Sequence, residues 1–384
     1  MSEPAALGVY VHWPYCARIC PYCDFNVVRD RKQAEQADLA AAIVADLKGQ
    51  RALTGPRRLV SVFLGGGTPS LMEPDLVAAI LARVRGTWTL ANDCEITLEA
   101  NPGSVEAGRF RGYRDAGVNR ISMGIQAFDD AALRRLGRVH SVAEARAAFD
   151  VARATFDRVS FDLIYARQDQ TLADWRDELQ AALAMAADHL SLYQLTVEAG
   201  TVFGDRLARG MLRGLPDDDL AADFYAATQD LCEAAGLPAY EVSNHARSGA
   251  ESRHNLIYWR AGDYAGIGPG AHGRLTLNGK RWATEAPRTP GVWLDLVEAE
   301  GCGESVRDGV APGDQALEYL MMALRLREGA SASRFASLGG RPVNPVRLAR
   351  MVEIGMVVTK DDDIIGTKSG RMVLNSVLAE LAAD

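Results

Sequence analysis

Three cysteines stand close together near the start of this 384-residue chain: Cys16, Cys20 and Cys23. Their CxxxCxxC spacing follows an apolar segment that is typical of a first β-strand. Three thiolates can bind three irons of a [4Fe–4S] cluster, which usually takes four cysteine ligands. The fourth iron would be open to a small molecule, and S-adenosylmethionine can chelate it through its amino and carboxylate groups. An electron from the cluster can then cleave the sulfonium of that ligand.

Two simpler chemistries are open for the same thiols, a zinc site and a disulfide. Zinc sites usually pair two CxxC-type units or add histidines at fixed spacings. The other cysteines, Cys94, Cys232 and Cys302, are isolated in the sequence. The pattern therefore favours the iron–sulfur interpretation over the other two.

Glycines and polar residues recur where further apolar segments end. Glycines let backbone groups approach a ligand closely, a carboxylate can accept hydrogen bonds from hydroxyls or an amine, and an arginine can pair with a carboxylate. A polar side chain buried in an apolar strand also needs a partner. The candidate ligand-binding residues of this kind are Gly66, Gly67, Thr68, Glu99, Gln126, Arg138 and Asp162.

Short apolar segments alternate with helical segments of ten or more residues, which is the pattern of βα units with a parallel sheet. Because polar residues follow many of the strands rather than one switch point, a barrel is favoured over an open doubly wound sheet. We predict an α/β fold, a partial (βα)6 TIM-like barrel. The six expected strands are residues 7–13, 59–64, 94–100, 120–126, 159–165 and 189–196.

The pattern loosens beyond residue 200, where a helix at 217–235 and a strand at 238–243 are expected. Three helical segments (314–327, 331–338 and 345–356) precede an expected hairpin at 364–374 and predict a small winged-helix-like domain. The predicted division is a barrel at residues 1–240, a connecting segment at 241–300 and a C-terminal helical domain at 301–384.

Composition restricts the partners and the compartment. The net charge of −8 argues against nucleic acid or an anionic membrane as the main partner. No apolar run approaches the roughly 18 residues of a membrane span, and the first six residues lack the features of a signal peptide. We therefore expect a cytoplasmic protein in a reducing compartment, where the cysteines stay able to bind metal.

A histidine-led aromatic segment, Arg253-His-Asn-Leu-Ile-Tyr-Trp259, is a further candidate site. Histidine can ligate heme iron, and Tyr and Trp can line a flat macrocycle. A core-facing aromatic strand with a hydrogen-bonded His254 explains the same residues, and residue chemistry alone favours that explanation.

Several motifs together resemble the radical SAM proteins related to oxygen-independent coproporphyrinogen III oxidase, over a range from about residue 8 to the C-terminus. They are Tyr10-Val-His-Trp-Pro-Tyr-Cys16 with the cysteine triad, Gly65-Gly-Gly-Thr-Pro-Ser70, Glu99-Ala-Asn-Pro102, Ser122-Met-Gly-Ile-Gln126 and Asp162-Leu-Ile-Tyr165. The resemblance implies a [4Fe–4S] cluster on the three cysteines, with Tyr22 beside it. It also implies S-adenosylmethionine contacts at Tyr10, Gly66, Gly67, Thr68, Glu99, Gln126, Arg138 and Asp162.

Two features resemble the heme-chaperone branch of this family rather than the oxidases. Phe25 stands where the oxidases have a further cysteine, and the expected first strand begins by residue 7, whereas the oxidases have a longer extension before the barrel. His254-Asn-Leu-Ile-Tyr-Trp259 matches a motif of the chaperones that is implicated in heme binding, which favours His254 as a heme contact. The resemblance thus implies heme, heme-accepting apoproteins such as membrane respiratory enzymes, and a candidate homodimer. The alternative is the oxidase itself, so whether the chain is an enzyme is left open.

One loop departs from the family pattern. Relatives usually have Gly-Leu-Pro-Gly-Gln-Thr after the Asp-Leu-Ile-Tyr motif, and this chain has Ala166-Arg-Gln-Asp-Gln-Thr171. The loss of two glycines and a proline is expected to change the rim of the pocket or the hold on the cofactor.

Overall fold

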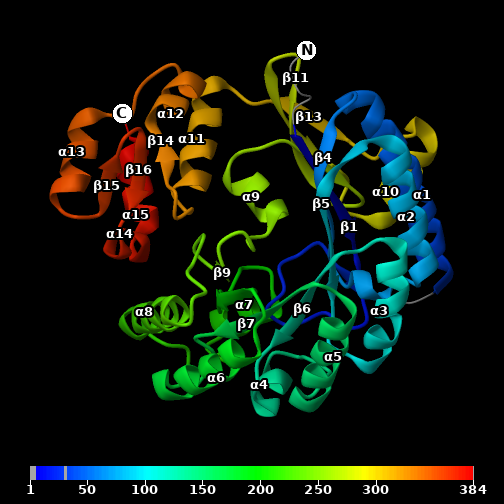
Figure 1. Cartoon of the computed structure of the whole chain (residues 1–384), viewed down its shortest axis with the longest axis horizontal. Helices are drawn as coiled ribbons and strands as arrows, with labels where there is room; N and C mark the ends of the chain where they lie inside the picture. Colours follow the sequence, from blue (N-terminus) through cyan, green and yellow to red (C-terminus); the bar gives the residue numbers. More distant parts are fainter. Residues whose placement is uncertain (1–5, 30–32, 384) are drawn as a thin grey trace.

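An eleven-stranded sheet runs through the described part of the chain, residues 6–29 and 33–383 of a computed structural model (Figure 1). Seven neighbouring strands are parallel, and antiparallel strands extend both edges. In spatial order they are β13 (Val306–Gly309), β12 (Lys280–Glu285), β11 (His272–Leu277), β10 (Tyr264–Ile267), β1 (Ala6–Trp13), β4 (Arg58–Gly66), β5 (Thr89–Ala100), β6 (Arg120–Gln126), β7 (Arg158–Tyr165), β8 (His189–Gln194) and β9 (Asn244–Ala246).

The six predicted βα strands are confirmed as neighbours in chain order, β1-β4-β5-β6-β7-β8. A doubly wound sheet would reverse its strand order at a switch point, and this row does not reverse. Strands covered on both faces carry near-continuous apolar runs, as β1 does with Leu7, Val9, Val11 and Trp13, all fully buried. The partial-barrel prediction is therefore correct.

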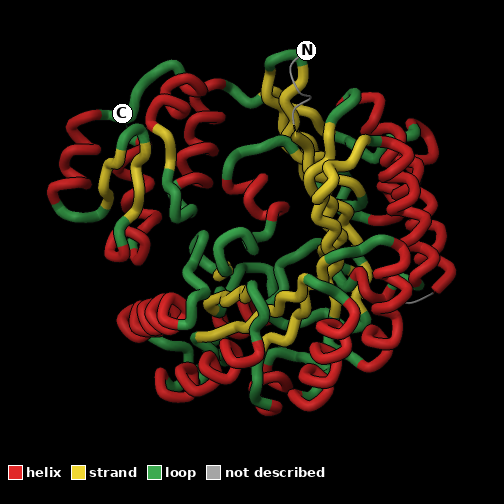
Figure 2. Tube along the Cα trace, in the orientation of Figure 1, coloured by secondary structure: helices red, strands yellow, loops and turns green. Residues whose placement is uncertain are grey.

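Helices cover the outer, convex side of the curved sheet (Figure 2). Two of them begin with a capping box, Ser141 with Glu144 and Thr171 with Asp174, which fixes where each loop turns into helix. The helices and one 3-10 turn of this part are α1 (Gln33–Thr54), η1 (Pro69–Leu71), α2 (Pro74–Thr87), α3 (Ser104–Ala116), α4 (Asp130–Arg135), α5 (Val142–Thr155), α6 (Leu172–Met185), α7 (Val202–Ala208), α8 (Asp218–Ala234) and α10 (Pro290–Glu300).

Residues 238–310 differ in part from the expectation. The strand predicted at 238–243 is wrong: Tyr240 N–H donates to Asn244 O, so the segment turns back on itself. The strand follows instead as β9. The predicted domain boundaries at residues 240 and 300 stay a prediction, and the hydrogen-bonded sheet crosses both of them through β9–β13.

The C-terminal region combines helices with a three-stranded sheet of order β14-β16-β15, as expected for a winged-helix-like domain. The hairpin predicted at 364–374 lies earlier, with Asp361 at φ +53° between its strands. Thr367 then caps a new helix by accepting the Gly370 N–H. The elements are α11 (Pro312–Ala323), β14 (Ala330–Ser331), α12 (Ala332–Gly339), α13 (Pro345–Glu353), β15 (Val357–Lys360), β16 (Asp363–Gly366), α14 (Lys368–Met372) and α15 (Leu374–Ala382).

Three short elements remain. The parallel pair β2 (Tyr15–Cys16) and β3 (Val28–Arg29) flanks the cysteine loop, and α9 (Arg253–Trp259) lies on the concave side of the sheet (Figure 1). Among the described residues, no helix has both the length and the apolar character needed to span a membrane. The cytoplasmic location stays a prediction, and residues 1–5, which bear on it, lie outside the described residues.

Candidate functional site

A cavity of about 140 Å³ opens at the carboxyl ends of β1, β4, β5, β6 and β7, where barrels of this kind place their sites. We call it the cofactor cavity. All three predicted cluster ligands and most of the predicted cofactor contacts share its wall. They are Cys16, Cys20, Cys23, Tyr22, Gly66, Gly67, Thr68, Glu99, Gln126, Arg138 and Asp162.

Two backbone hydrogen bonds hold the cysteine loop, one that joins its two flanks and one within it. Val28 N–H donates to Pro14 O at 2.8 Å, and Cys23 N–H donates to Cys20 O at 3.1 Å. Burial raises the pKa of the Cys16 thiol and raises that of Cys23 to about 11. Because thiolates are the metal-binding form, binding iron here must release protons.

Three cysteine thiols of this cavity are the residue type that holds an iron–sulfur cluster. All six cysteines are free. Among the described residues, no group of three or more His, Cys, Asp or Glu side chains converges on a point that could hold one metal ion. A cluster makes a different demand, because each cysteine binds its own iron.

Two glycines allow the β4 loop to pass against the cysteine segment. Gly66 has φ +106°, and a Cβ there would lie 2.6 Å from the ring of His12. A Cβ on Gly67 would lie 2.7 Å from Tyr15 O. The Gly66 N–H donates to Glu99 Oε2 at 3.1 Å, so the loop also orients a carboxylate of the cavity.

Two carboxylates, Glu99 and Asp162, share the wall of the cavity. Burial, and then repulsion from Asp162, raises the pKa of Glu99 to about 8. Burial also raises the pKa of Asp162 to about 6, against hydrogen bonds from Ser191 and Ser122 and the charge of Arg138. No ion pair joins Glu99 to an arginine among the described residues. A cationic or hydroxyl-rich ligand would satisfy this pair.

Gln126 and Arg138 each have a buried polar atom without a hydrogen-bond partner. Gln126 ends β6 at φ +73°, a conformation that non-glycine residues rarely adopt, and its Oε1 is buried without a hydrogen-bond partner. Arg138 donates to Cys20 Sγ at 3.5 Å, Asn101 Oδ1 at 2.6 Å and Gly124 O at 2.8 Å, while its Nε has no partner. The cavity thus offers acceptors, carboxylates and a guanidinium, which suits an amino-acid nucleoside such as S-adenosylmethionine beside a cluster.

The cavity is also lined by residues that were not predicted as contacts, among them Arg18, Asn101, Ser122 and Gly124. Ser122 and Gly124 alternate with Gln126 along β6, and residues two apart share one face of a strand. That periodicity was the signal that could have found them. Asn101 links Arg138 to Thr68 through its amide, with Nδ2 at 3.4 Å from Thr68 Oγ1.

The predicted aromatic contacts divide between the cavity and its surroundings. Tyr22 lines the cavity and packs against Phe203 with ring centroids 6.5 Å apart. Tyr10 lies outside the lining, and its hydroxyl bonds His12 Nδ1 at 2.9 Å. Phe25 stands at the mouth of the cavity and is 61% exposed, so an apolar ring occupies the position of the oxidases' further cysteine.

His254 is not part of the cofactor cavity. His254 is the second residue of α9 and is 1% exposed. Its Nδ1 bonds Ser61 Oγ at 2.8 Å, its Nε2 bonds the Tyr258 hydroxyl at 2.7 Å, and its ring stacks on Phe63. Burial lowers its pKa to about 3. Both ring nitrogens are therefore engaged within the chain, and the segment is a helix rather than a strand.

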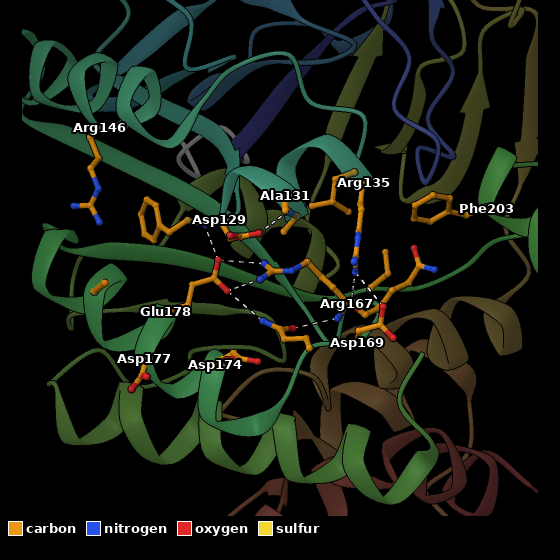
Figure 3. A pocket seen from close by; sticks show the side chains of 17 residues that line it. Asp129, Ala131, Arg135, Arg146, Arg167, Asp169, Asp174, Asp177, Glu178 and Phe203 are labelled. Atoms are coloured by element: carbon orange, nitrogen blue, oxygen red, sulfur yellow. Dashed lines mark hydrogen bonds and ion pairs between the residues drawn. The ribbon is translucent and has the colours of Figure 1, made fainter. Parts of the chain in front are cut away.

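The loop that departs from the family pattern borders a second cavity of about 550 Å³ beside α4 and α6 (Figure 3). Ala166 and Asp169 both have φ +56°, and these are the two positions where relatives carry glycine. Arg167 in the same loop forms an ion pair with Glu178 at 2.6 Å (Figure 3). None of residues 166–170 lines the cofactor cavity, so the loop shapes the neighbouring cavity instead.

Comparison with known proteins agrees with this geometry. Residues 10–182 match the model of the Radical SAM superfamily. The chain is 38% identical to the heme chaperone HemW of Escherichia coli K12, with 100% of each chain covered, and 36% identical to that of Haemophilus influenzae, with 98% of each covered. A mouse protein, the mitochondrial radical S-adenosyl methionine domain-containing protein 1, is 43% identical over 86% of this chain and 75% of its own length.

A solved structure shares the fold. Coproporphyrinogen III oxidase (HemN) from Escherichia coli, described as a radical SAM enzyme, superposes with a TM-score of 0.82 over 99% of this chain and 91% of that chain. The sequence identity is 20%, so this likeness concerns the architecture.

Proposed function

Because this chain belongs to the radical SAM superfamily and, within it, to the family of the HemW heme chaperones, we propose that it binds heme, a [4Fe–4S] cluster and S-adenosylmethionine and delivers heme to acceptor proteins. The observation that carries the proposal is the cofactor cavity, in which three free thiols share one wall with unsatisfied polar groups. Full-length similarity to the chaperones supports the heme part.

Each group of the cavity has a role in this proposal. Cys16, Cys20 and Cys23 hold the cluster as thiolates, and Arg138 beside Cys20 offsets part of their negative charge. Glu99 and Asp162 take the cationic and hydroxyl groups of S-adenosylmethionine, while Gln126 offers its free Oε1. When bound, the cluster supplies the electron that can cleave the sulfonium. Phe25, at the mouth, restricts water.

The assignment of His254 to heme stays a prediction, and the geometry sets a condition for it. Iron can reach a ring nitrogen only after the bond to Ser61 or to Tyr258 opens. Moving α9 away from β4 would do this. The Tyr10 contact to S-adenosylmethionine likewise requires the Tyr10 hydroxyl to leave His12.

The partners follow from the same proposal. The acceptors are heme-requiring apoproteins, with membrane respiratory enzymes as candidates, and nucleic acid is not expected given the net charge of −8. Homodimer formation through the face that carries the cluster is a candidate assembly. Ile19 and Phe25, exposed apolar side chains beside the cavity, support a contact there.

The alternative function, decarboxylation of the propionates of coproporphyrinogen III, rests on the shared architecture. An anaerobic assay separates the two. Cluster-loaded protein with reductant, S-adenosylmethionine and coproporphyrinogen III is expected to yield no protoporphyrinogen while binding heme in a parallel titration. Clear turnover would overturn the chaperone proposal in favour of the oxidase.

A further inference from the structure

Two cysteine sulfurs of the cofactor cavity accept a hydrogen bond from a side chain of the barrel. Thr68 Oγ1 lies 3.5 Å from Cys16 Sγ, and Arg138 Nη1 lies 3.5 Å from Cys20 Sγ. Thr68 is buried in the loop after β4, whereas Arg138 follows α4. The two donors therefore come from different parts of the chain, and both reach atoms that the proposed function assigns to the cluster.

Asn101, the residue that follows β5, joins these two donors. Its side-chain Oδ1 accepts from Arg138 Nη2 at 2.6 Å, and its Nδ2 donates to Thr68 Oγ1 at 3.4 Å. The backbone N–H of Asn101 donates to Ser70 Oγ at 3.2 Å, which holds the residue against the loop after β4. One side chain thus contacts both groups that donate to the cysteine sulfurs.

The direction of each hydrogen bond follows from the chemistry of the three side chains. A guanidinium carries only donors, so the amide oxygen of Asn101 faces Arg138 and its NH2 group faces Thr68. The Thr68 hydroxyl has a single hydrogen. Because its oxygen already accepts from Asn101, that hydrogen is left for Cys16 Sγ. The asparagine therefore selects the arrangement in which both neighbours donate to sulfur.

We propose that Asn101 is a positioning residue that raises the reduction potential of the cluster by holding Thr68 and Arg138 as donors to its cysteine ligands. This inference rests on the proposed function and deepens it. Hydrogen bonds to the sulfurs are among the features that set the potential of such clusters. They stabilise the reduced form more, because it carries one more negative charge. Asn101 thereby makes one-electron reduction by an external reductant more favourable.

The test is an anaerobic titration of the full-length, cluster-loaded protein with dithionite, followed by the EPR signal of the reduced cluster. Asn101→Leu should take up iron like the wild type. Its midpoint potential should fall by about 59 mV, which is about a tenfold fall in the one-electron equilibrium constant. The matched control is Asn119→Leu, which lies outside the cavity and loses two hydrogen bonds of 2.8 Å, to Ile96 N–H and Cys94 O. The control should lose stability and keep the potential of the wild type.

A pair of variants at Thr68 tests the same route without changing Asn101, and it decides alone where Asn101→Leu takes up no cluster. Thr68→Val removes the hydroxyl and should lower the potential, whereas Thr68→Ser keeps the hydroxyl and should match the wild type. Added to Asn101→Leu, Thr68→Val should lower the potential by less than it does alone, since part of the effect passes through this hydroxyl.

The outcomes separate this inference from the proposed function. Equal potentials in the loaded wild type and loaded Asn101→Leu would overturn this inference alone. Equal potentials in Thr68→Val and Thr68→Ser would do the same. A wild type that takes up no cluster would overturn the proposed function as well.

Discussion

The cofactor cavity and the surroundings of His254 are built on the same two strands, β1 and β4. They differ in whether their polar groups already have hydrogen-bond partners within the chain. At the end of β4, Gly66 opens toward a cavity with orphaned polar atoms on Gln126 and Arg138. A few residues earlier on the same strand, the Ser61 hydroxyl bonds Nδ1 of His254, and the Phe63 ring stacks on the His254 ring. Family motifs lie in both regions, and the difference is that both ring nitrogens of His254 already have partners.

The two regions also differ in what they contribute to the stability of the fold. In the cavity, the charge of Asp162 repels that of Glu99 and Gln126 has φ +73°, and features of this kind cost stability and cluster at functional sites. Around His254, the network continues into Glu95, which accepts from the His254 backbone N–H and pairs with Arg120. That network holds α9 against the sheet. The first region thus has polar groups that are free for a ligand, whereas the ring nitrogens of His254 are engaged within the chain in the conformation described.

The largest expected effect is loss of the cluster in Cys20→Ser. The variant should lose the brown colour and fall from about four irons per chain to less than about one, because a cluster ligand is gone. Iron analysis and visible absorption after anaerobic reconstitution provide the measurement. Cys302→Ser, which alters a thiol that accepts from Gln50 far from the cavity, is the matched control and should keep its iron. Full iron content in Cys20→Ser would contradict the claim that the cofactor cavity holds the cluster through Cys20.

His254→Ala should lower the free energy of unfolding by about 3 kcal/mol, since it removes a buried ring and leaves the Ser61 and Tyr258 hydroxyls without their partner. Urea unfolding of the cluster-free protein measures this. The control is His272→Ala, a half-exposed histidine, which should cost less than about 0.5 kcal/mol. A His254→Ala protein as stable as the control would show that the ring is not an anchor.

The carboxylates of the cavity should make the cluster-free protein less stable as the pH rises. The pKa of Glu99 is about 8 in the folded chain and about 4.3 when unfolded. Its contribution is therefore fully present below pH about 4.3 and is lost as the pH rises through about 8. Glu99→Gln should reduce this slope in urea unfolding measured across the same range. Identical slopes in variant and wild type would contradict the raised pKa.

The smallest effect concerns strain. Gln126→Gly should leave stability unchanged or raise it by about 0.5–1 kcal/mol, because glycine adopts φ +73° freely and no orphaned amide remains. Thermal unfolding compares it with Gln194→Gly, a glutamine at the end of β8 that lies outside the positive-φ set and should lose stability. A marked loss in Gln126→Gly would mean that this residue is held by contacts rather than strained.

Sequence patterns predicted the barrel, and most of the candidate cofactor residues they named lie around one cavity, because both depend on local features. The cysteine spacing, the Gly66 turn and the apolar strands each act within a few residues. What the sequence could not show depends largely on distant partners. The surroundings of Tyr10 and His254, whose ligand contacts stay predictions, are set by Ser61, His12 and Tyr258 together, and no spacing in the sequence encodes those contacts. The misplaced strand at 238–243 has a local origin instead, since the Tyr240 N–H donates to Asn244 O and turns the segment back on itself.

The most direct measurement is a paired titration of S-adenosylmethionine and heme into separate samples of cluster-loaded wild type and Gln126→Gly. The account predicts that the variant binds S-adenosylmethionine at least about tenfold more weakly, through loss of the Gln126 amide, and binds heme with unchanged affinity. Unchanged S-adenosylmethionine affinity, or a parallel loss of both ligands, would contradict the claim that the cofactor cavity holds this cofactor and lies apart from the heme site.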